Sequence, residues 1–303
     1  MRVAAIDIGT NTVLLLVAER TKDGLVAVEE HASITRLGEG VDRTRKLLPA
    51  AIARTAEVLD RYAGIIRRLG AERVDVVGTS AMRDAEGGAE VRAHVENVIG
   101  VPARTISGDE EARLTFAGAL SGIPDVKPGD AVRVFDIGGG STEIVHGADG
   151  AIGYAHSFDV GSVRLTERHV KSDPPVAAEI EAVRASARAT FAAVPAFTSA
   201  VAPVGIAGTM TTLAAVFLRM KEWDGKRVHG LHLPVKELER VVAELAALPL
   251  AERSNVPGLE PKRADVIVAG GHIALAYLAH VGASEVIVSD RGVRWGLAAQ
   301  LSS

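Results

Sequence analysis

The chain has 303 residues, a formal net charge of −4 and a hydrophobic content of 48%. This length suggests two domains of about 150 residues each, and the charge gives no basic surface of the kind that binds nucleic acid. The absence of cysteine excludes disulfides, thiol nucleophiles and cysteine metal sites. The N-terminus lacks a signal-peptide pattern, and the longest uncharged apolar run is shorter than the about 20 residues of a membrane span. We therefore expect a cytoplasmic protein without nucleic-acid or membrane partners.

A series of short elements opens the chain and recurs in its second half. An apolar strand at 3–6 leads to Asp7-Ile8-Gly9, a second strand at 13–18, the turn Asp23-Gly24 and a third strand at 25–29. From residue 132 the chain again gives a strand, Asp136-Ile137-Gly138, a strand, Asp149-Gly150 and a strand. Two unrelated hairpins are a weak alternative, because both Asp-Ile-Gly and the later Asp-Gly recur in the same order. The repeat predicts duplicated domains.

The segments between and after these series alternate helices with strands. The first half predicts helices at 47–69, 89–99 and 107–120 and strands at 74–77 and 104–106. The second half predicts helices at 176–194, 238–248, 263–279 and 297–301 and strands at 201–206 and 286–289. Pro124 and Pro128 mark a boundary, so we expect domains at 1–125 and 126–303. Each domain should be α/β, with helices covering a mixed sheet.

The stretch 136–143 carries the strongest chemical signal. Asp136 ends a strand, three glycines follow at 138–140, and Ser141, Thr142 and Glu143 complete the loop. Backbone N–H groups with flanking hydroxyls form an anion nest, and two carboxylates hold a hard divalent cation. The composition also suits an ordinary hairpin turn. It is neither a Walker loop nor a dinucleotide fingerprint, because no Gly-Lys-Ser/Thr follows and the loop runs into a strand.

The repeat assigns this loop a partner and shows how the two differ. If the two halves face each other, the two Asp-Ile-Gly loops would oppose one another across a cleft, and Asp7 could join Asp136 and Glu143 around Mg²⁺. Asp7 is also a common turn-forming residue at a strand end. Leu14 occupies the position equivalent to Glu143. The second copy therefore looks specialised.

Further loops at strand ends supply candidates for a base and for anion clamps. Ser107 and Glu110 match a capping box, which leaves Glu111 as a spare carboxylate that could deprotonate water. Spacing alone does not separate the two glutamates. Arg83 suits either a phosphate clamp or a solvated helix start. Gly208-Thr209 begins a helix and suits either an anion site or an N-cap.

The ordered motifs of this sequence resemble the exopolyphosphatase and guanosine pentaphosphate phosphohydrolase family, which belongs to the sugar kinase, heat-shock protein and actin superfamily. The resemblance covers almost the whole chain and implies two duplicated ribonuclease-H-like (actin-like) domains with a central cleft. It rests on Asp7–Thr12, Gly78–Arg83, Ser107–Arg113, Asp136–Glu143, Gly208–Thr212, Val228-His229-Gly230, Gly258–Asp265 and Gly292–Leu297.

The resemblance also assigns roles to individual residues. It implies that Glu111 is the catalytic base and that Asp136 and Glu143 bind Mg²⁺ (or Mn²⁺), with Asp7 close by. The implied phosphate contacts are Thr10, Asn11, Thr12, Ser80, Arg83, Gly138, Gly139, Gly140, Ser141, Thr142, Gly208 and Thr209.

The expected activity is release of terminal orthophosphate from inorganic polyphosphate by attack of water. The alternatives are hydrolysis of guanosine pentaphosphate, an actin-like ATPase or kinase, and a polyphosphate-binding module without catalysis. Family members form homodimers, so a homodimer is also possible here. The long members carry additional helical C-terminal domains, which we do not expect in these 303 residues, so we do not expect their processive binding of very long chains here.

Overall fold

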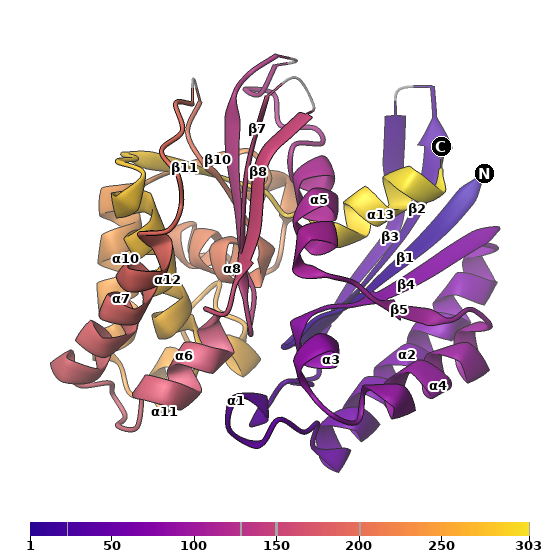
Figure 1. Cartoon of the computed structure of the whole chain (residues 1–303), viewed down its shortest axis with the longest axis horizontal. Helices are drawn as coiled ribbons and strands as arrows, with labels where there is room; N and C mark the ends of the chain where they lie inside the picture. Colours follow the sequence, from indigo (N-terminus) through magenta and orange to yellow (C-terminus); the bar gives the residue numbers. More distant parts are fainter. Residues whose placement is uncertain (23, 128, 149–150, 200, 303) are drawn as a thin grey trace. The chain divides into compact units, whose positions relative to one another are not determined.

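The computed structural model describes residues 1–22, 24–127, 129–148, 151–199 and 201–302. Its internal contacts separate two compact units, one of Met1–Gly118 together with Val293–Ser303 and one of Ala119–Gly292. Each unit contains one sheet covered by helices (Figure 1). The predicted turn residues Asp23, Asp149 and Gly150 lie outside the described residues.

The first unit contains a five-stranded sheet in the order β3-β2-β1-β4-β5. Its first three strands form an antiparallel meander, whereas β1, β4 and β5 run parallel. The strands are β1 (Arg2–Ile8), β2 (Thr12–Thr21), β3 (Gly24–Ile34), β4 (Arg73–Gly78) and β5 (Ala103–Thr105). The helices are α1 (Val41–Thr44), α2 (Pro49–Leu69), α3 (Ser80–Asp84), α4 (Gly88–Ile99), α5 (Gly108–Ala119) and α13 (Val293–Leu301).

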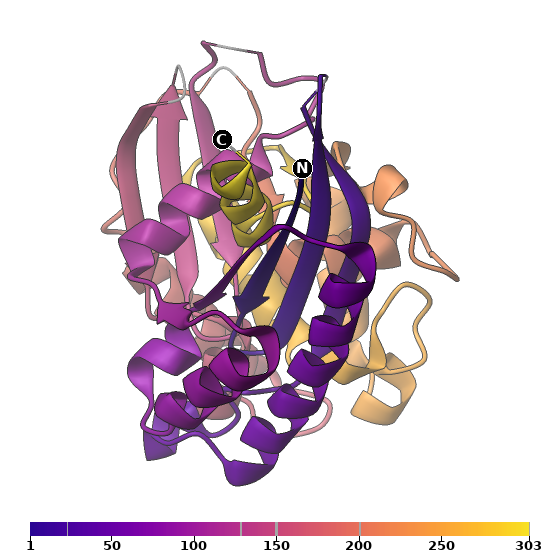
Figure 2. The same ribbon diagram turned by 90° about the vertical axis from the view of Figure 1, so that its right-hand side faces the viewer.

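Both faces of this sheet are buried, which explains why β1 is apolar at nearly every position. Ala4, Ile6 and Ile8 face a core that includes residues of α2 and α4. The intervening side chains of Val3 and Ala5 pack with α13 and α5 on the opposite face. Figure 2 shows α2 and α4 together on one side of these strands. The predicted helix at 47–69 is confirmed as α2, which begins with Pro49 and ends at Gly70 with a φ of 64°.

The second unit contains a six-stranded sheet in the order β10-β11-β9-β6-β7-β8. The strands are β6 (Val132–Ile137), β7 (Thr142–Ala148), β8 (Ala151–Phe158), β9 (Val204–Ile206), β10 (Leu231–Pro234) and β11 (Glu285–Val288). The helices are α6 (Ser162–His169), α7 (Ala177–Phe191), α8 (Ala207–Phe217), α9 (Gly225–Val228), α10 (Val235–Ala247), α11 (Leu250–Arg253), the 3-10 turn η1 (Pro261–Arg263) and α12 (Ile267–His280). Helix α12 is central, packing against α6, α7, α8 and α10.

The two sheets repeat one topology. In each, an antiparallel three-strand meander is followed by two strands parallel to the first strand of the meander. The meander β6-β7-β8 thus corresponds to β1-β2-β3, and the parallel strands β9 and β11 correspond to β4 and β5. The antiparallel strand β10 is an addition at the edge of the second sheet. The predicted duplicated α/β architecture is confirmed. None of the helices in the described ranges combines the length and apolar character that crossing a membrane requires.

The unit boundaries differ from the domains predicted at 1–125 and 126–303. The change occurs between Gly118 and Ala119, and α13 belongs to the first unit. The reason is packing: Trp295, Leu297 and Ala298 share a core with Val3 and Leu16. Sequence order hides this contact, because α13 lies far along the chain from the strands that it covers.

Gly296 allows α13 to approach α5 closely, which gives a stability prediction. A Cβ at Gly296 would lie 2.1 Å from the backbone oxygen of Leu114, so we expect Gly296→Ala to destabilise the fold by about 1–3 kcal/mol. Gly64 is an exposed residue within α2 with open space around its Cα, so Gly64→Ala should stabilise by about 0.5–1 kcal/mol. Urea unfolding of both variants checks the contrast. Equal effects of the two substitutions would contradict it.

Burial of His146 predicts acid sensitivity of the second unit. This residue is 1% exposed and stacks on Phe197 with ring centroids 4.7 Å apart. Burial, and secondarily Arg133, lower the pKa of His146 from 6.5 to about 4. The unfolded chain therefore binds the proton more readily, so this contribution to stability is complete above pH 6.5 and declines as the pH falls toward 4.

His146→Phe keeps an aromatic ring but removes the titration. We expect its free energy of unfolding to fall less between pH 7 and pH 5 than that of the wild type, as measured by urea unfolding at both values. A slope equal to that of the wild type would show that His146 does not contribute.

Candidate functional site

The glycine loop between β6 and β7 is a tight hairpin closed by a hydrogen bond from the N–H of Gly138 to the carbonyl of Ser141, 3.0 Å. Its carbonyl groups are held by the segment after β8. The carbonyl of Gly138 accepts from the N–H of Ser162, 2.9 Å, and that of Gly139 accepts from the N–H groups of Val163 and Arg164. The first turn of α6 therefore contacts the loop from behind.

This contact fixes the direction of the loop amides. In a trans peptide the N–H points opposite to the C=O, and the described peptides of this loop are trans. Because the carbonyls of Gly138, Gly139 and Gly140 point toward residues 162–164, the N–H groups of Gly139, Gly140 and Ser141 point to the other side. In the described part of the chain none of these three N–H groups donates a hydrogen bond to the protein. Three N–H groups that face the same side of a loop can bind an anion, so the anion nest stays a prediction that this geometry permits.

Two carboxylates flank this nest. Asp136 on β6 and Glu143 on β7 are directly opposite in the antiparallel register. Cross-strand partners project from the same face with their Cβ atoms about 4.5–5.5 Å apart. Glu143 is buried at 1% exposure, and its Oε1 accepts a hydrogen bond of 2.6 Å from the hydroxyl of Ser157. Two carboxylates at this distance are able to share a divalent cation.

Asp136 and Glu143 fit Mg²⁺ or Mn²⁺ as a partial ligand set. Within the described ranges, no group of three His, Asp or Glu side chains is close enough to hold a metal ion alone. Mg²⁺ usually binds through one or two protein carboxylates and completes its shell with water and substrate phosphate oxygens. The hairpin supplies that number of carboxylates beside an anion nest.

The start of α8 supports the same loop. The hydroxyl of Thr209 donates to the carbonyl of Ile137, 2.9 Å, and the hydroxyl of Thr142 donates to the carbonyl of Val160, 2.5 Å. Both side chains are buried. Their hydroxyl protons are donated to backbone carbonyls, and the phosphate contacts that the resemblance implies for these two residues stay predictions. Their side chains hold the loop in place.

Gly208 lies directly against the guanidinium of Arg263. A Cβ at Gly208 would lie within 2.4 Å of three guanidinium atoms of Arg263. Burial lowers the pKa of Arg263 to about 10, which still leaves it charged at neutral pH. The guanidinium therefore places positive charge beside the first turn of α8, at the carboxyl end of β9.

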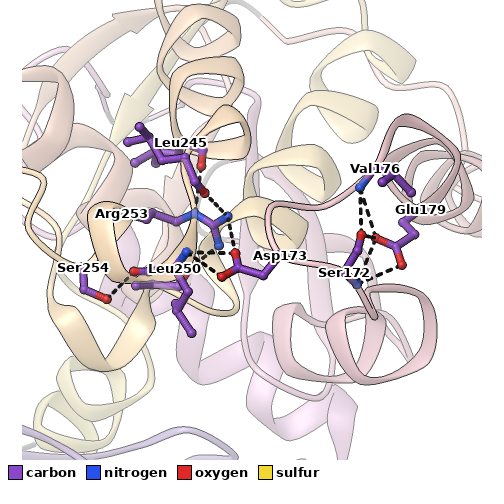
Figure 3. A network of polar contacts seen from close by, with 10 residues as sticks. Ser172, Asp173, Val176, Glu179, Leu245, Leu250, Arg253 and Ser254 are labelled. Atoms are coloured by element: carbon purple, nitrogen blue, oxygen red, sulfur yellow. Dashed lines mark hydrogen bonds and ion pairs between the residues drawn. The ribbon is translucent and has the colours of Figure 1, made fainter.

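A buried neighbour anchors the segment that carries Arg263. Arg253 is 2% exposed and donates hydrogen bonds to the carbonyls of Leu245, Leu248 and Ala264, the last at 2.9 Å. Figure 3 shows Arg253 beside Asp173, which accepts from the N–H of Leu250 at 2.8 Å. Since Ala264 directly follows Arg263, these bonds fix the chain at that point.

The first unit contains a matching hairpin without the second carboxylate. The N–H of Gly9 donates to the carbonyl of Thr12 at 3.0 Å, as Gly138 does to Ser141. Asp7 is opposite Leu14, so the predicted equivalence of Leu14 and Glu143 is confirmed by register. The hydroxyls of Thr10 and Ser80 are 2.7 Å apart, which joins the predicted residues of two loops.

Carbonyl groups of this first loop are also held from behind. Those of Thr10 and Asn11 accept from the N–H groups of residues 35, 36 and 38. Thr10, Asn11 and Asp7 are buried, and Thr12 begins β2. The repeat therefore extends beyond the hairpin to the segment that supports it.

Glu111 and Arg83 form an ion pair in the first unit. Arg83 Nη1 donates to Glu111 Oε2 at 3.1 Å and to the carbonyl of Ile106 at 3.0 Å. Glu111 is 6% exposed. Glu110 instead has its N–H capped by the Ser107 hydroxyl, 3.1 Å, and its carboxylate paired with Arg104 at 2.8 Å. The structure thus separates the two glutamates that spacing could not.

Comparison with known proteins identifies the family of this chain. A sequence profile of the Ppx/GppA phosphatase family matches residues 16–302. The chain belongs to the Ppx/GppA phosphatase family. It is 38% identical over 320 residues to exopolyphosphatase 2 of Mycobacterium tuberculosis, an alignment that covers 99% of this chain and 98% of that protein.

Solved Ppx/GppA relatives share the whole fold. The Aquifex aeolicus family member is 34% identical with a TM-score of 0.82, covering 99% of this chain and 97% of that one. An exopolyphosphatase-like protein is 32% identical with a TM-score of 0.91 over the same shares of the two chains. These matches confirm the predicted fold class of duplicated α/β domains.

Two arginines of this Ppx/GppA chain escaped the sequence analysis as site residues. Arg263 lies in the motif 258–265, but no local pattern connects that motif to Gly208. Arg164 donates from Nε to the carbonyl of Gly140 at 2.7 Å, yet in sequence it resembles an ordinary helical arginine. The only signal in the sequence was a glycine at each point of contact, Gly208 for Arg263 and Gly140 for Arg164.

Gly161 offers a direct test of the loop geometry. Its φ of −145° is accessible to any residue, but a Cβ there would lie 2.4 Å from the carbonyl oxygen of Gly139. We expect Gly161→Ala to displace the loop and weaken binding of inorganic phosphate and tripolyphosphate at least about 10-fold, because the N–H donors of the loop lose their alignment. Calorimetric titration measures both affinities.

Gly153 provides the matched control in the same sheet. A Cβ at Gly153 meets only the carbonyl oxygen of His146 at 3.8 Å, an ordinary contact. Gly153→Ala should therefore bind both anions as the wild type does. Unchanged binding in Gly161→Ala would mean that the loop amides are not the anion site.

Proposed function

We propose that this chain is an exopolyphosphatase that releases terminal orthophosphate from inorganic polyphosphate by attack of water. The observation that carries the proposal is the loop at 138–141, where three N–H groups face away from the bound carbonyls beside the cross-strand pair of Asp136 and Glu143. An anion nest next to two carboxylates suits a phosphoryl group accompanied by a divalent cation. The relative in M. tuberculosis named exopolyphosphatase 2 supports this substrate class.

In the proposed mechanism the terminal phosphoryl group is bound by the N–H groups of Gly139, Gly140 and Ser141. Asp136 and Glu143 would hold Mg²⁺ or Mn²⁺, and Asp7 stays a predicted metal ligand. The ion, when bound, neutralises negative charge on phosphate oxygens. The protein contributes mainly by orienting these groups and stabilising charge, as is usual in phosphoryl transfer. Thr10, Asn11, Thr12, Ser80 and Gly208 remain proposed phosphate contacts.

Glu111 is the proposed base that orients and deprotonates the attacking water. Its carboxylate is buried and positioned by the Arg83 guanidinium. Arg83 remains a candidate phosphate clamp, since a guanidinium has five N–H donors, of which Nη1 serves Glu111 and the Ile106 carbonyl while Nε lies 3.9 Å from Oδ1 of Asp84. One arginine then serves to orient the base and to bind the anion.

Glu111→Gln tests this assignment. The amide keeps the shape of the side chain but is no base, so we expect phosphate release from polyphosphate to fall at least about 100-fold while polyphosphate still binds. Phosphate release in steady state with Mg²⁺ and calorimetric binding measure the two effects. Glu110→Gln, next to it and paired with Arg104, should retain wild-type turnover. Wild-type turnover of Glu111→Gln would show that the assigned base is wrong.

A substrate panel separates the proposed function from its alternatives. Phosphate release is measured with Mg²⁺ from short polyphosphate, long polyphosphate, guanosine pentaphosphate and ATP. We expect polyphosphate to be the preferred substrate. Preference for guanosine pentaphosphate would assign the chain to the other activity in the family name, and exclusive ATP cleavage would favour an ATPase. Binding of polyphosphate without release would indicate a binding module.

A further inference from the structure

Arg164 is a buried cation that contacts the anion loop from its rear side. Its Nε donates to the carbonyl of Gly140 at 2.7 Å, and the residue is only 6% exposed. Its Nη2 lies 3.6 Å from Oδ1 of Asp159, whose side chain is 83% exposed.

The position of this contact within the loop matters. The carbonyls of Gly138 and Gly139 are held by backbone N–H groups of residues 162–164, whereas that of Gly140 is held by the Arg164 side chain. The carbonyl of Gly140 and the N–H of Ser141 belong to the same peptide plane. A guanidinium on the carbonyl therefore sets the direction of the Ser141 N–H and polarises it as a donor.

The hairpin of the first unit differs from that of the second in the groups that bind its carbonyls. Its hairpin carbonyls, on Thr10 and Asn11, accept from backbone N–H groups at residues 35, 36 and 38. The corresponding support in the second unit includes a buried guanidinium. The same unit also has Glu143 where the first has Leu14. Both differences add a charged side chain at the hairpin of the second unit, the Arg164 guanidinium and the Glu143 carboxylate.

We propose that Arg164 is a positioning residue for phosphoryl transfer, which aims and polarises the Ser141 N–H at the terminal phosphoryl group. This inference rests on the proposed function. Arg164 acts through the peptide of Gly140 and Ser141 and does not itself touch the substrate. Because negative charge on the phosphoryl oxygens is stabilised by preoriented donors, the effect should fall mainly on kcat.

The experiment compares Arg164→Met, Arg164→Lys and the wild type in Mg²⁺-dependent phosphate release from tripolyphosphate. Loss of a whole oxyanion donor costs about 100- to 1,000-fold in kcat; misorienting one donor should cost less, about 10- to 100-fold in Arg164→Met. KM should rise less than kcat falls. Arg164→Lys keeps the charge and one donor, so it should recover part of the loss.

A surface arginine of the same unit is the matched control. Arg188 pairs with Glu181 on the exposed side of α7. Arg188→Met should keep the wild-type kcat and KM. Thermal unfolding of each variant separates lost activity from lost fold. If Arg164→Met does not fold, the comparison of Arg164→Lys with the wild type decides: a fall in kcat of at least about 5-fold at an unchanged melting temperature supports the positioning role.

If Arg164→Met folds and has the wild-type kcat, the inference is wrong. If Arg164→Met does not fold, a wild-type kcat in Arg164→Lys has the same meaning. Equal losses in Arg164→Met and Arg164→Lys with a matching loss of thermal stability would also overturn the inference, because they indicate a purely structural arginine. The proposed function has its own test: it is wrong if the wild-type protein releases no phosphate from polyphosphate.

Discussion

The planar peptide is the constraint on which the second unit's site depends. When a carbonyl of the glycine loop is bound on one side, the N–H of the next residue must point to the other side. Residues 162–164 bind three consecutive carbonyls, and three N–H groups are thereby aligned. A flexible glycine loop would lose this alignment to conformational entropy. The contacts behind the loop are therefore as important to the site as the loop itself.

Duplication explains both the likeness and the division of labour of the two units. Each presents an Asp-Ile-Gly hairpin, closed by the same hydrogen bond and supported by the segment after the third strand. Antiparallel register determines what each hairpin carries, because opposite residues project from one face. The register partner of Asp7 is Leu14, while that of Asp136 is Glu143. One substitution thus separates a site with one carboxylate from a site with two.

The pair of Glu111 and Arg83 shows how the first unit compensates a buried carboxylate. Burying an isolated charge is costly, and the cost falls when an opposite charge with good hydrogen-bond geometry accompanies it. Arg83 meets this requirement through Nη1 and is itself anchored on the carbonyl of Ile106. Glu110, one residue earlier, faces outward to Arg104. Helical geometry alone places the two glutamates in different environments.

Periodicity, turn chemistry and the internal repeat determined much of this protein from the sequence by itself. They predicted the alternation of helices and strands, the duplication, and the glycine loop with its two carboxylates, because each of these is encoded by residues near one another in the chain. Local patterns could not place α13 with the first unit, bring Arg263 over Gly208 or put Arg164 behind Gly140. Nor could they show that the hydroxyls of Thr142 and Thr209 are bonded to backbone carbonyls. Those features depend on contacts between segments distant in sequence, which only the packing of the folded chain decides.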